Sequence, residues 1–268
     1  MATIKPFKAI RPVKDKVSLV TSRSYHEYSK RELNAVLEFN PFSFLHIINP
    51  GYKYAKNVSG EERFKLVHNR YLEFLEENVF LKDSSDSIYL YQMKKGNRSF
   101  TGFFCATSVA EYRNNLIKKH ENTIKLREEL FASYLDTVKF NAEPVLMTYA
   151  DDQVIAGLLS SVMQEEPEYL FATSDKIAHR LWKISNKISI NKIQKAFEKV
   201  DALYIADGHH RSASSNLLAL QAEQKNKSYD GKEPYNFFMS YSSSKIKNIH
   251  KSISKFQTHI LSIYYRYF

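Results

Sequence analysis

The stretch Leu203-Tyr204-Ile205-Ala206-Asp207-Gly208-His209-His210-Arg211-Ser212 changes from apolar to polar residues at its midpoint. Its apolar half predicts a short buried strand, and the residues that follow, as far as Leu220, predict the first turns of a helix. Gly208 lies between the two, where a glycine adopts a positive φ easily and leaves room for a ligand beside the backbone. A strand–turn–helix unit is therefore expected here.

The turn combines residue types that bind anions and metal ions. Free backbone N–H groups and the positive end of the helix dipole point outward at a helix N-terminus. Arg211 can bind a phosphate or carboxylate through two parallel hydrogen bonds. Asp207 can bind a metal ion or accept a proton from a hydroxyl group. The alternative is a structural corner, because Asp-Gly is common in ordinary turns; the density of polar residues favours a functional site.

Composition limits the classes of protein that the chain can represent. Its 268 residues, 43% hydrophobic and 25% charged, are typical of a soluble globular protein. The sequence has no apolar run of membrane-spanning length and no signal-peptide core. The single cysteine, Cys105, excludes an internal disulfide and a cysteine-based zinc cluster, and its apolar neighbours predict a buried, inert thiol. These features favour a cytoplasmic protein without membrane contact.

Charge is distributed unevenly along the chain. The net charge is +10, and residues 241–268 contain five basic residues and no acidic one. Residues 234–268 lack aspartate and glutamate altogether, although the whole chain has 29 of them. The remainder is mildly basic, which suits an anionic small ligand as well as a nucleic acid. We therefore predict a main domain over residues 1–240 and an atypical basic tail over residues 241–268.

Predicted strands and helices alternate along the chain. Residues 5–25 predict extended segments and loops, and Ser29 with Glu32 forms a capping-box pattern before a helix. Helices are expected at 30–39, 61–78, 109–138, 151–168 and 189–199. Strands are expected at 42–48, 88–93, 99–105, within 140–149, and at 173–184 and 203–207. This alternation predicts an α/β or α+β fold in which helices flank a mixed sheet.

Two of the predicted elements contain histidines that need an interpretation. His46 has apolar neighbours and is expected to be a packed, hydrogen-bonded core residue rather than a ligand. In the predicted helix 109–138, helical spacing places His120, Thr123 and Arg127 on one face. A zinc-protease motif would need a second histidine where Ile124 stands, so that motif is excluded. The alternative for this helix is a charged face exposed to solvent.

Six ordered stretches between residues 5 and 240 resemble the bacterial family known as domain of unknown function 1015. They are residues 7–12 (FKAIRP), 40–46 (NPFSFLH), 120–123 (HENT), 141–144 (NAEP), 179–182 (HRLW) and 204–212 (YIADGHHRS). Members of that family look longer, at about 400 residues, more than a typical single domain. The resemblance therefore implies that the family domain is incomplete at its C-terminal end and that a frameshift or truncation produced the basic tail.

The Asp-Gly-His-His-Arg element is also similar to the phosphate-binding loop of the ParB and sulfiredoxin-like fold, whose members bind nucleotides. Some relatives with a similar loop are free-serine kinases. The resemblance implies a ParB-like element around residues 203–220, with nucleotide or phosphate contacts at Asp207, His209, His210 and Arg211. The sequence contains no GxxxxGK[ST] loop, so a Walker-type nucleotide site is excluded.

Our first functional hypothesis is a nucleotide-dependent phosphotransferase that acts on a small molecule with Mg²⁺ as cofactor. The expected phosphate-binding residues are Gly208, Arg211, Ser212 and Arg127. The expected catalytic residues are Asp207, His209, His210, Glu121 and His120, and Asp207 or Glu121 would hold the Mg²⁺. The alternatives are a ParB-like nucleotide-sensing or DNA-binding module without turnover, and an inactive truncated copy.

Overall fold

A computed structural model describes residues 3–244 and the strand Tyr265–Arg266. Most of the predicted basic tail, residues 245–264 and 267–268, lies outside the described residues. Within the described part, every helix is too short or too polar to cross a lipid bilayer.

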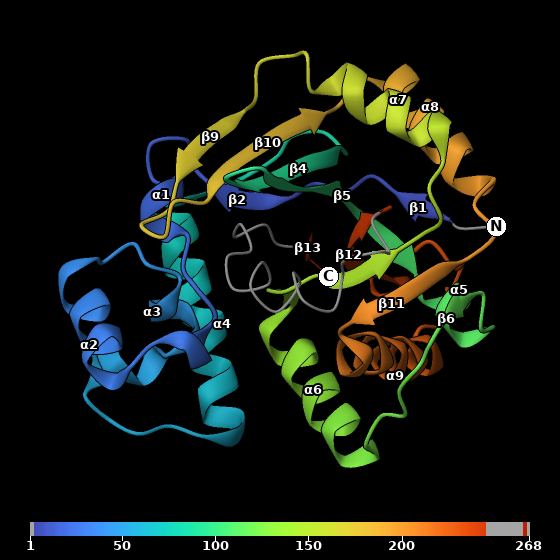
Figure 1. Ribbon diagram of the computed structural model, residues 1–268. Coiled ribbons are helices and arrows are strands. Elements are labelled where there is room, and N and C mark those ends of the chain that lie inside the picture. Colours follow the sequence, from blue (N-terminus) through green and yellow to red (C-terminus); the bar gives the residue numbers. More distant parts are fainter. Residues whose placement is uncertain (1–2, 245–264, 267–268) are drawn as a thin grey trace.

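One mixed sheet organises the described part of the chain (Figure 1). Its strand order is β6-β11-β8-β12-β5-β4-β10-β9, and β1 also pairs with β5. These strands are β1 (Ile4–Lys5), β4 (Ile88–Lys95), β5 (Arg98–Ser108), β6 (Ile117–Lys118), β8 (Val145–Thr148), β9 (Tyr169–Ala172), β10 (Ala178–Ile184), β11 (Leu203–Asp207) and β12 (Phe237–Ser243). Two further pairs join β2 (Ile10–Pro12) to β3 (Phe80–Lys82) and β7 (Phe140–Asn141) to β13 (Tyr265–Arg266). The expected mixed sheet is confirmed.

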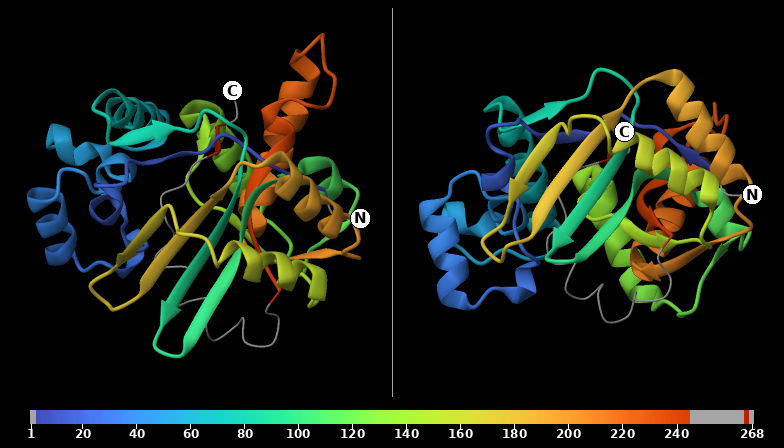
Figure 2. Two further views of the ribbon diagram at one scale, coloured as in Figure 1. Left: turned by 90° about the horizontal axis from the view of Figure 1, so that it is seen from above. Right: turned by 45° about the horizontal axis from the view of Figure 1, so that its top comes forward.

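Helices cover the sheet on both sides, α7 and α8 on one and α6 and α9 on the other (Figure 1). A second group, coloured blue to cyan, lies beside the sheet in both views of Figure 2. The α-helices of the described residues are α1 (Val17–Val20), α2 (Lys30–Phe39), α3 (Leu45–Ile48), α4 (Gly60–Glu76), α5 (Val109–Arg113), α6 (Lys125–Val138), α7 (Gln153–Val162), α8 (Lys187–Glu198) and α9 (His209–Lys225). The short 3₁₀ helices are Tyr25–Glu27, Pro50–Tyr54 and Pro234–Asn236.

Local signals explain where several helices begin. The Ser29 hydroxyl accepts a hydrogen bond from the Glu32 backbone N–H (3.2 Å), and the Glu32 carboxylate accepts one from the Ser29 N–H (2.9 Å), so the predicted capping box is present. Asp152 caps α7 and Asn186 caps α8 in the same manner, by accepting backbone N–H groups of the first turn.

Two apolar cores stabilise the two groups of elements. The larger one lies against the sheet, where Phe103 and Tyr149 contact the ring of Phe197 from α8. The smaller one joins α1, α3 and α4 to β3 and β7, and Tyr71 stacks there on Phe140. The β4–β5 hairpin was predicted, and its aromatic residues pack in the sheet core as expected.

Strand β12 is a central strand of the sheet and continues to Ser243. It pairs with β5 in antiparallel and with β8 in parallel orientation. The first three residues of the predicted tail, 241–243, therefore lie in this strand.

Two predicted strands are wrong in type or extent, and the predicted helix 151–168 ends early, at Val162. Residues 45–48 form helix α3 instead of a strand, because an apolar run of this length fits a buried helix equally well. The expected strand 173–184 is formed only from Ala178 onward, because residues 173–177 form the turn after strand β9, which the pattern did not predict. His46 is nonetheless a packed core residue as expected: its Nε2 lies 3.1 Å from the Asn40 carbonyl oxygen.

The largest error concerns the predicted helix 109–138. Helix α5 ends after Arg113, Asn115 adopts a left-handed conformation with φ of 56°, and β6 follows before α6 begins at Lys125. Asparagine is one of the few residues that adopt this conformation readily, so the Asn-Asn pair breaks the helix. His120 and Thr123 consequently lie in a loop and do not share a helix face with Arg127.

Candidate functional site

The direction of neighbouring strands brings two of the polar stretches together. Strands β6 and β11 are parallel, with Leu203 opposite Ile117 and Tyr204 opposite Lys118. The segments that follow two parallel strands leave the sheet at the same end. The loop with His120 and Glu121 therefore lies next to the start of α9, which follows β11.

A third polar stretch, residues 143–144, precedes strand β8, the other neighbour of β11 in the sheet. Strand β8 is antiparallel to β11, and Leu146 lies opposite Asp207. Because antiparallel strands place the start of one beside the end of the other, Glu143 and Pro144, which precede β8, lie beside the Asp207 turn. Residues 141–144 belong to the stretches of the resemblance, but no pattern in the sequence predicts a role for them in a site.

Gly208 makes the sharp turn between β11 and α9. Its φ is +96°, a region that residues with a side chain rarely adopt. A Cβ atom at this position would lie 3.1 Å from Arg211 Nη1 and 3.4 Å from the Val145 Cα. No side chain caps α9 within the described residues, so the first N–H groups of this 17-residue helix are available to a ligand.

Arg211 connects the three residues around this turn. Its Nη2 lies 2.5 Å from Asp207 Oδ2 and 3.5 Å from Glu143 Oε2, and its Nη1 donates a hydrogen bond to the Pro144 carbonyl oxygen. The guanidinium is thus already bound within the protein, and it shapes the loop as well as offering its remaining N–H groups to a ligand.

His209 and His120 meet on the other side of the turn. Their ring centroids are 4.3 Å apart in an edge-to-face arrangement. Glu121 lies between them, with Oε2 3.6 Å from His209 Nδ1 and Oε1 3.7 Å from His120 Nε2. His209 is buried, at 5% exposure, and burial together with the neighbouring His120 lowers its pKa. At neutral pH His209 is therefore an uncharged imidazole that can accept a proton or bind a metal ion.

The other predicted site residues have different surroundings. Ser212 is fully buried, and its hydroxyl donates hydrogen bonds to the carbonyl groups of Gly208 and His209. The Nδ1 atom of His210 is buried and has no hydrogen-bond partner among the described residues. Arg127 is exposed in the first turn of α6 and forms none of the described hydrogen bonds or ion pairs that join the loops.

The charges of the site favour a bound cation. Of the charged side chains joined by these contacts, Asp207, Glu121 and Glu143 are carboxylates and only Arg211 is basic. A metal ion would reduce the repulsion between these carboxylates, and an anionic ligand would need such an ion beside it.

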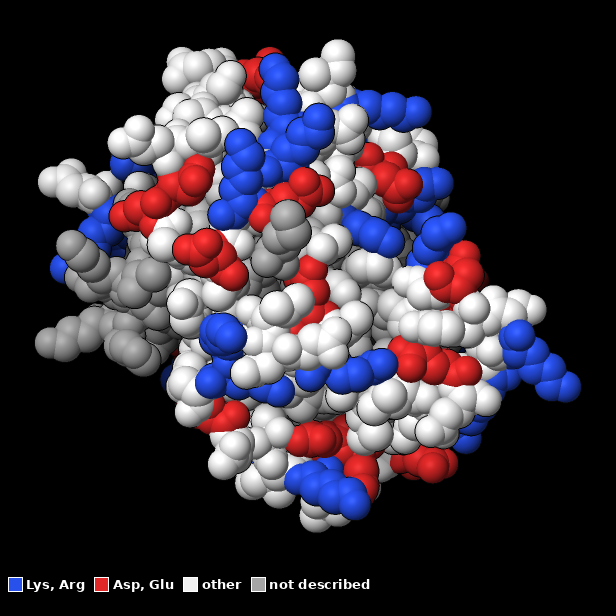
Figure 3. Space-filling view, turned by 90° about the vertical axis from the view of Figure 1, so that its right-hand side faces the viewer, with Lys and Arg blue, Asp and Glu red and all other residues white. Residues whose placement is uncertain are grey.

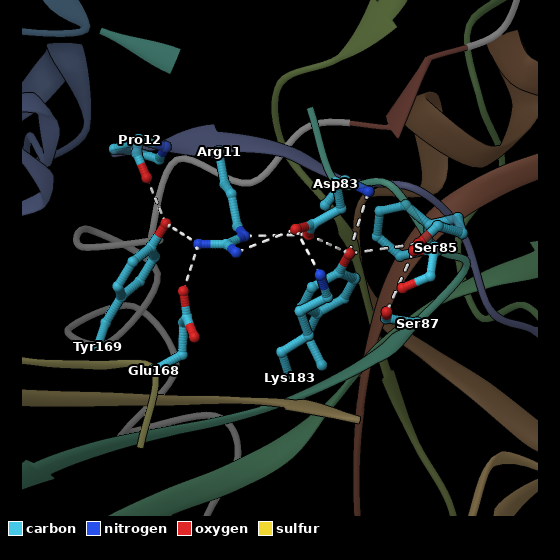
Figure 4. Close-up of polar contacts among 11 residues, drawn as sticks. Arg11, Pro12, Asp83, Ser85, Ser87, Glu168, Tyr169 and Lys183 are labelled. Atoms are coloured by element: carbon cyan, nitrogen blue, oxygen red, sulfur yellow. Dashed lines mark hydrogen bonds and ion pairs between the residues drawn. The ribbon is translucent and has the colours of Figure 1, made fainter. Parts of the chain in front are cut away.

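Single polar residues in the remaining stretches of the resemblance, Arg11, His46 and His179, are buried and hydrogen-bonded within the protein. Figure 4 shows the buried cluster around Arg11, whose Nε and Nη2 donate hydrogen bonds to the two oxygens of Asp83, each at 3.0 Å. Lys183 and Tyr89 donate to the same carboxylate, at 2.7 and 2.6 Å. Arg11 lies in β2 and Asp83 directly after β3, whereas Tyr89 and Lys183 lie in β4 and β10, so the cluster joins the β2–β3 pair to the main sheet.

His179 and Cys105 are likewise enclosed by the protein. His179 is fully buried, stacks on Phe171, and its Nδ1 lies 2.6 Å from the Tyr91 hydroxyl. Cys105 is buried as expected, and burial raises its pKa to about 11, so the thiol is inert at neutral pH. An open groove of about 690 Å³ beside β4 and β10 contains Lys94, Arg180 and Trp182. It shares no residue with the loop cluster, which consists of the turn 207–212 and the loops 119–124 and 142–144.

Comparisons with known proteins identify a family only. No curated protein and no solved structure matches the chain in these comparisons. Residues 4–250 match the family model described as Protein of unknown function (DUF1015), which covers most of the 268 residues. The chain therefore belongs to the DUF1015 family.

Proposed function

We propose that the protein binds a nucleotide or another phosphorylated small molecule at the start of α9 and transfers a phosphoryl group. The observation that carries this proposal is the meeting of three polar loops at an uncapped helix N-terminus. Backbone N–H groups at such a position bind phosphate oxygens. The similarity of this turn to the phosphate loop of the ParB and sulfiredoxin-like fold supports the same assignment.

The proposed roles follow from the contacts. The N–H groups after Gly208 and the remaining N–H groups of Arg211 bind the phosphate. Asp207 carries the Mg²⁺ that accompanies a nucleotide, since carboxylate oxygen is the ligand that Mg²⁺ prefers. His209 or His210 stabilises the charge of the transferring group, and the exposed carboxylate of Glu121 or His120 accepts the proton of the acceptor hydroxyl.

The test is a thermal-shift titration of the full chain with ATP, ADP, CTP and pyrophosphate, each with and without Mg²⁺. A ligand at about 100 times its Kd stabilises a protein by about 2.7 kcal/mol. For a chain of this size each kcal/mol raises the Tm by roughly 2–4 °C, so we expect a shift of several degrees with one nucleotide and Mg²⁺.

A matched pair of variants locates the binding site. Arg211→Gln removes the guanidinium at the start of α9, and Arg113→Gln removes one that binds Asn216 and Glu223 of the same helix outside the turn. We expect the shift to disappear only in Arg211→Gln. Absence of any shift in the wild-type chain, or equal shifts in both variants, would reject the proposal. Product formation from the stabilising nucleotide then distinguishes transfer from binding alone.

The charge pattern on one face of the protein (Figure 3) gives no support to the alternative of a DNA-binding module. On the face shown in Figure 3, basic and acidic side chains are interspersed. Binding to DNA depends on neutralising many phosphates and weakens steeply with salt. DNA binding with that salt dependence, in a chain that shows no nucleotide shift, would support the alternative instead.

A further inference from the structure

His209 is a buried side chain whose two nitrogens lack hydrogen bonds of ordinary length. Its Nδ1 lies 3.6 Å from Glu121 Oε2, and its Nε2 lies 3.5 Å from the His120 backbone N–H group that points to it. Both distances exceed the 2.7–3.2 Å that is usual for N–H···O bonds. Nε2 thus accepts one long hydrogen bond, whereas Nδ1 has only the contact with the exposed carboxylate of Glu121, so Nδ1 can bind a ligand that the protein itself does not supply.

The donor atoms around His209 are spaced much as metal ligands are. One nitrogen from each of His120 and His209 and one carboxylate oxygen of Glu121 all lie within 4.8 Å of one another. The two oxygens of Glu121 each face one histidine, Oε2 at 3.6 Å from His209 Nδ1 and Oε1 at 3.7 Å from His120 Nε2. Ligand bonds of about 2.0–2.1 Å to a tetrahedral ion place neighbouring ligand atoms about 3.4 Å apart. A small inward movement of the two exposed loop residues would therefore complete the geometry.

The chemistry of these donors selects the kind of ion. Two imidazoles and one carboxylate form the ligand set of catalytic zinc sites and of non-haem iron sites, which keep positions open for water or substrate. Mg²⁺ prefers oxygen ligands and binds imidazole poorly. We propose that His120, Glu121 and His209 bind one first-row transition-metal ion, with Zn²⁺ as the best-fitting member of that class.

The position of the ligands makes this site part of the loop cluster. With His120, Glu121 and His209 as ligands of the resident ion, His210 is left to stabilise the transferring group and Asp207 to hold the Mg²⁺ of a nucleotide. The ion then replaces Glu121 and His120 in activating the acceptor hydroxyl. Because His209 is the first residue of α9, an ion held there would lie beside the proposed phosphate site and could supply Lewis-acid chemistry to it. This catalytic use rests on the proposed function, whereas binding of the ion does not.

Cobalt provides a direct probe, because Co²⁺ substitutes for Zn²⁺ and its visible absorption reports protein ligands. The full chain, purified without a polyhistidine tag, is stripped with a chelator and titrated with Co²⁺, then with Zn²⁺ or an excess of Mg²⁺. We expect one Co²⁺ per chain with absorption bands of a low-coordinate site. Zn²⁺ should remove these bands, and Mg²⁺ should not.

Two exposed ligands allow the site to be tested without disturbing the fold. His120 and Glu121 are 51% and 65% exposed in their side chains, so His120→Ala and Glu121→Gln should keep the wild-type Tm in the absence of metal. Because altering even an outer-shell partner costs about 10–100-fold in metal affinity, losing a ligand should weaken Co²⁺ binding by at least about 100-fold. His26→Ala and Glu166→Gln change exposed residues of the same types elsewhere and serve as controls.

The outcomes separate this proposal from the proposed function. Failure of the wild-type chain to develop Co²⁺ absorption, or wild-type affinity in both His120→Ala and Glu121→Gln, would overturn the metal site. Metal binding in a chain that shows no nucleotide shift would uphold the site and reject only the phosphotransfer function. A nucleotide shift without Co²⁺ binding would uphold nucleotide binding and reject the metal site.

Discussion

Replacing Asp83 with alanine tests whether the buried charge cluster stabilises the junction between the N-terminal strands and the main sheet. The Asp83 side chain is only 2% exposed. It accepts two hydrogen bonds from Arg11, one from Lys183 and one from the Tyr89 hydroxyl (Figure 4). The substitution removes all four and leaves the buried guanidinium without its main counter-charge.

The expected loss of stability is large because Asp83→Ala leaves the positive charge of Arg11 buried. Removing one member of a buried ion pair costs about 3–5 kcal/mol, because the other charge stays buried without its full compensation. Here Arg11 keeps a contact of 3.0 Å with the part-exposed carboxylate of Glu168. Whole proteins are stable by only about 5–15 kcal/mol. With about 2–4 °C of Tm per kcal/mol at this size, Asp83→Ala should lower the Tm by roughly 6–20 °C.

Thermal unfolding followed by circular dichroism measures this loss directly. The control is Asp136→Ala, because Asp136 forms an exposed pair with Lys139 on α6 and such pairs contribute about 0–1 kcal/mol. The double substitution Arg11→Met with Asp83→Leu should cost less than the sum of its single changes, because it removes both charges at once.

The same cluster predicts how stability changes at acidic pH. Burial alone would raise the pKa of Asp83, but its hydrogen bonds with Arg11, Lys183 and Tyr89 outweigh that effect and lower it. The carboxylate therefore stabilises the fold fully above its ordinary pKa of 3.8, and this contribution is lost as the pH falls through the lowered value.

A Tm for Asp83→Ala close to that of Asp136→Ala would refute the assigned role of the cluster.

Two further predictions concern Gly208 and His46. Gly208→Ala should cost about 1–2 kcal/mol for the left-handed backbone. In urea unfolding it should be less stable than Gly96→Ala, whose added Cβ meets nothing within 4 Å, because a Cβ at Gly208 meets Arg211; equal losses would contradict this. Burial lowers the pKa of His46, so the unfolded chain binds the proton more readily and stability should fall as the pH drops below about 6.5. His46→Gln should flatten that dependence between pH 5 and 7 (roughly, around the ordinary histidine pKa).

The sequence predicts those elements whose signals are local. The Ser29–Glu32 capping box, the β4–β5 hairpin and the turn from β11 into α9 each depend on residues within a few positions of one another. Short-range patterns of this kind are sufficient for the type of each element and for the mixed α/β class. The structure confirms all three elements and the class.

Prediction fails where distant pairing decides the structure. Strand β6 has only two residues and no strand pattern of its own; it exists because it pairs with β11, about 85 residues later in the chain. Propensity and periodicity cannot contain that information, and tertiary pairing overrides them. The prediction of a helix over residues 109–138 therefore missed strand β6, whose pairing places the following residues His120 and Glu121 at the site.

Hydrogen bonding distinguishes the turn after β11 from the other stretches of the resemblance, whereas residue type does not. Arg11, His46 and His179 are as polar as the residues of the turn, yet each is buried with partners at 2.6–3.1 Å and has little capacity left for a ligand. His209 is equally buried, but its contacts are long, and His210 Nδ1 has no partner among the described residues. Polar groups that the protein buries without satisfying cost stability, so we take His209 and His210 as the residues of these stretches that a ligand would complete. On this physical ground the turn after β11, rather than the other polar stretches, is the place to look for the chemistry of this protein.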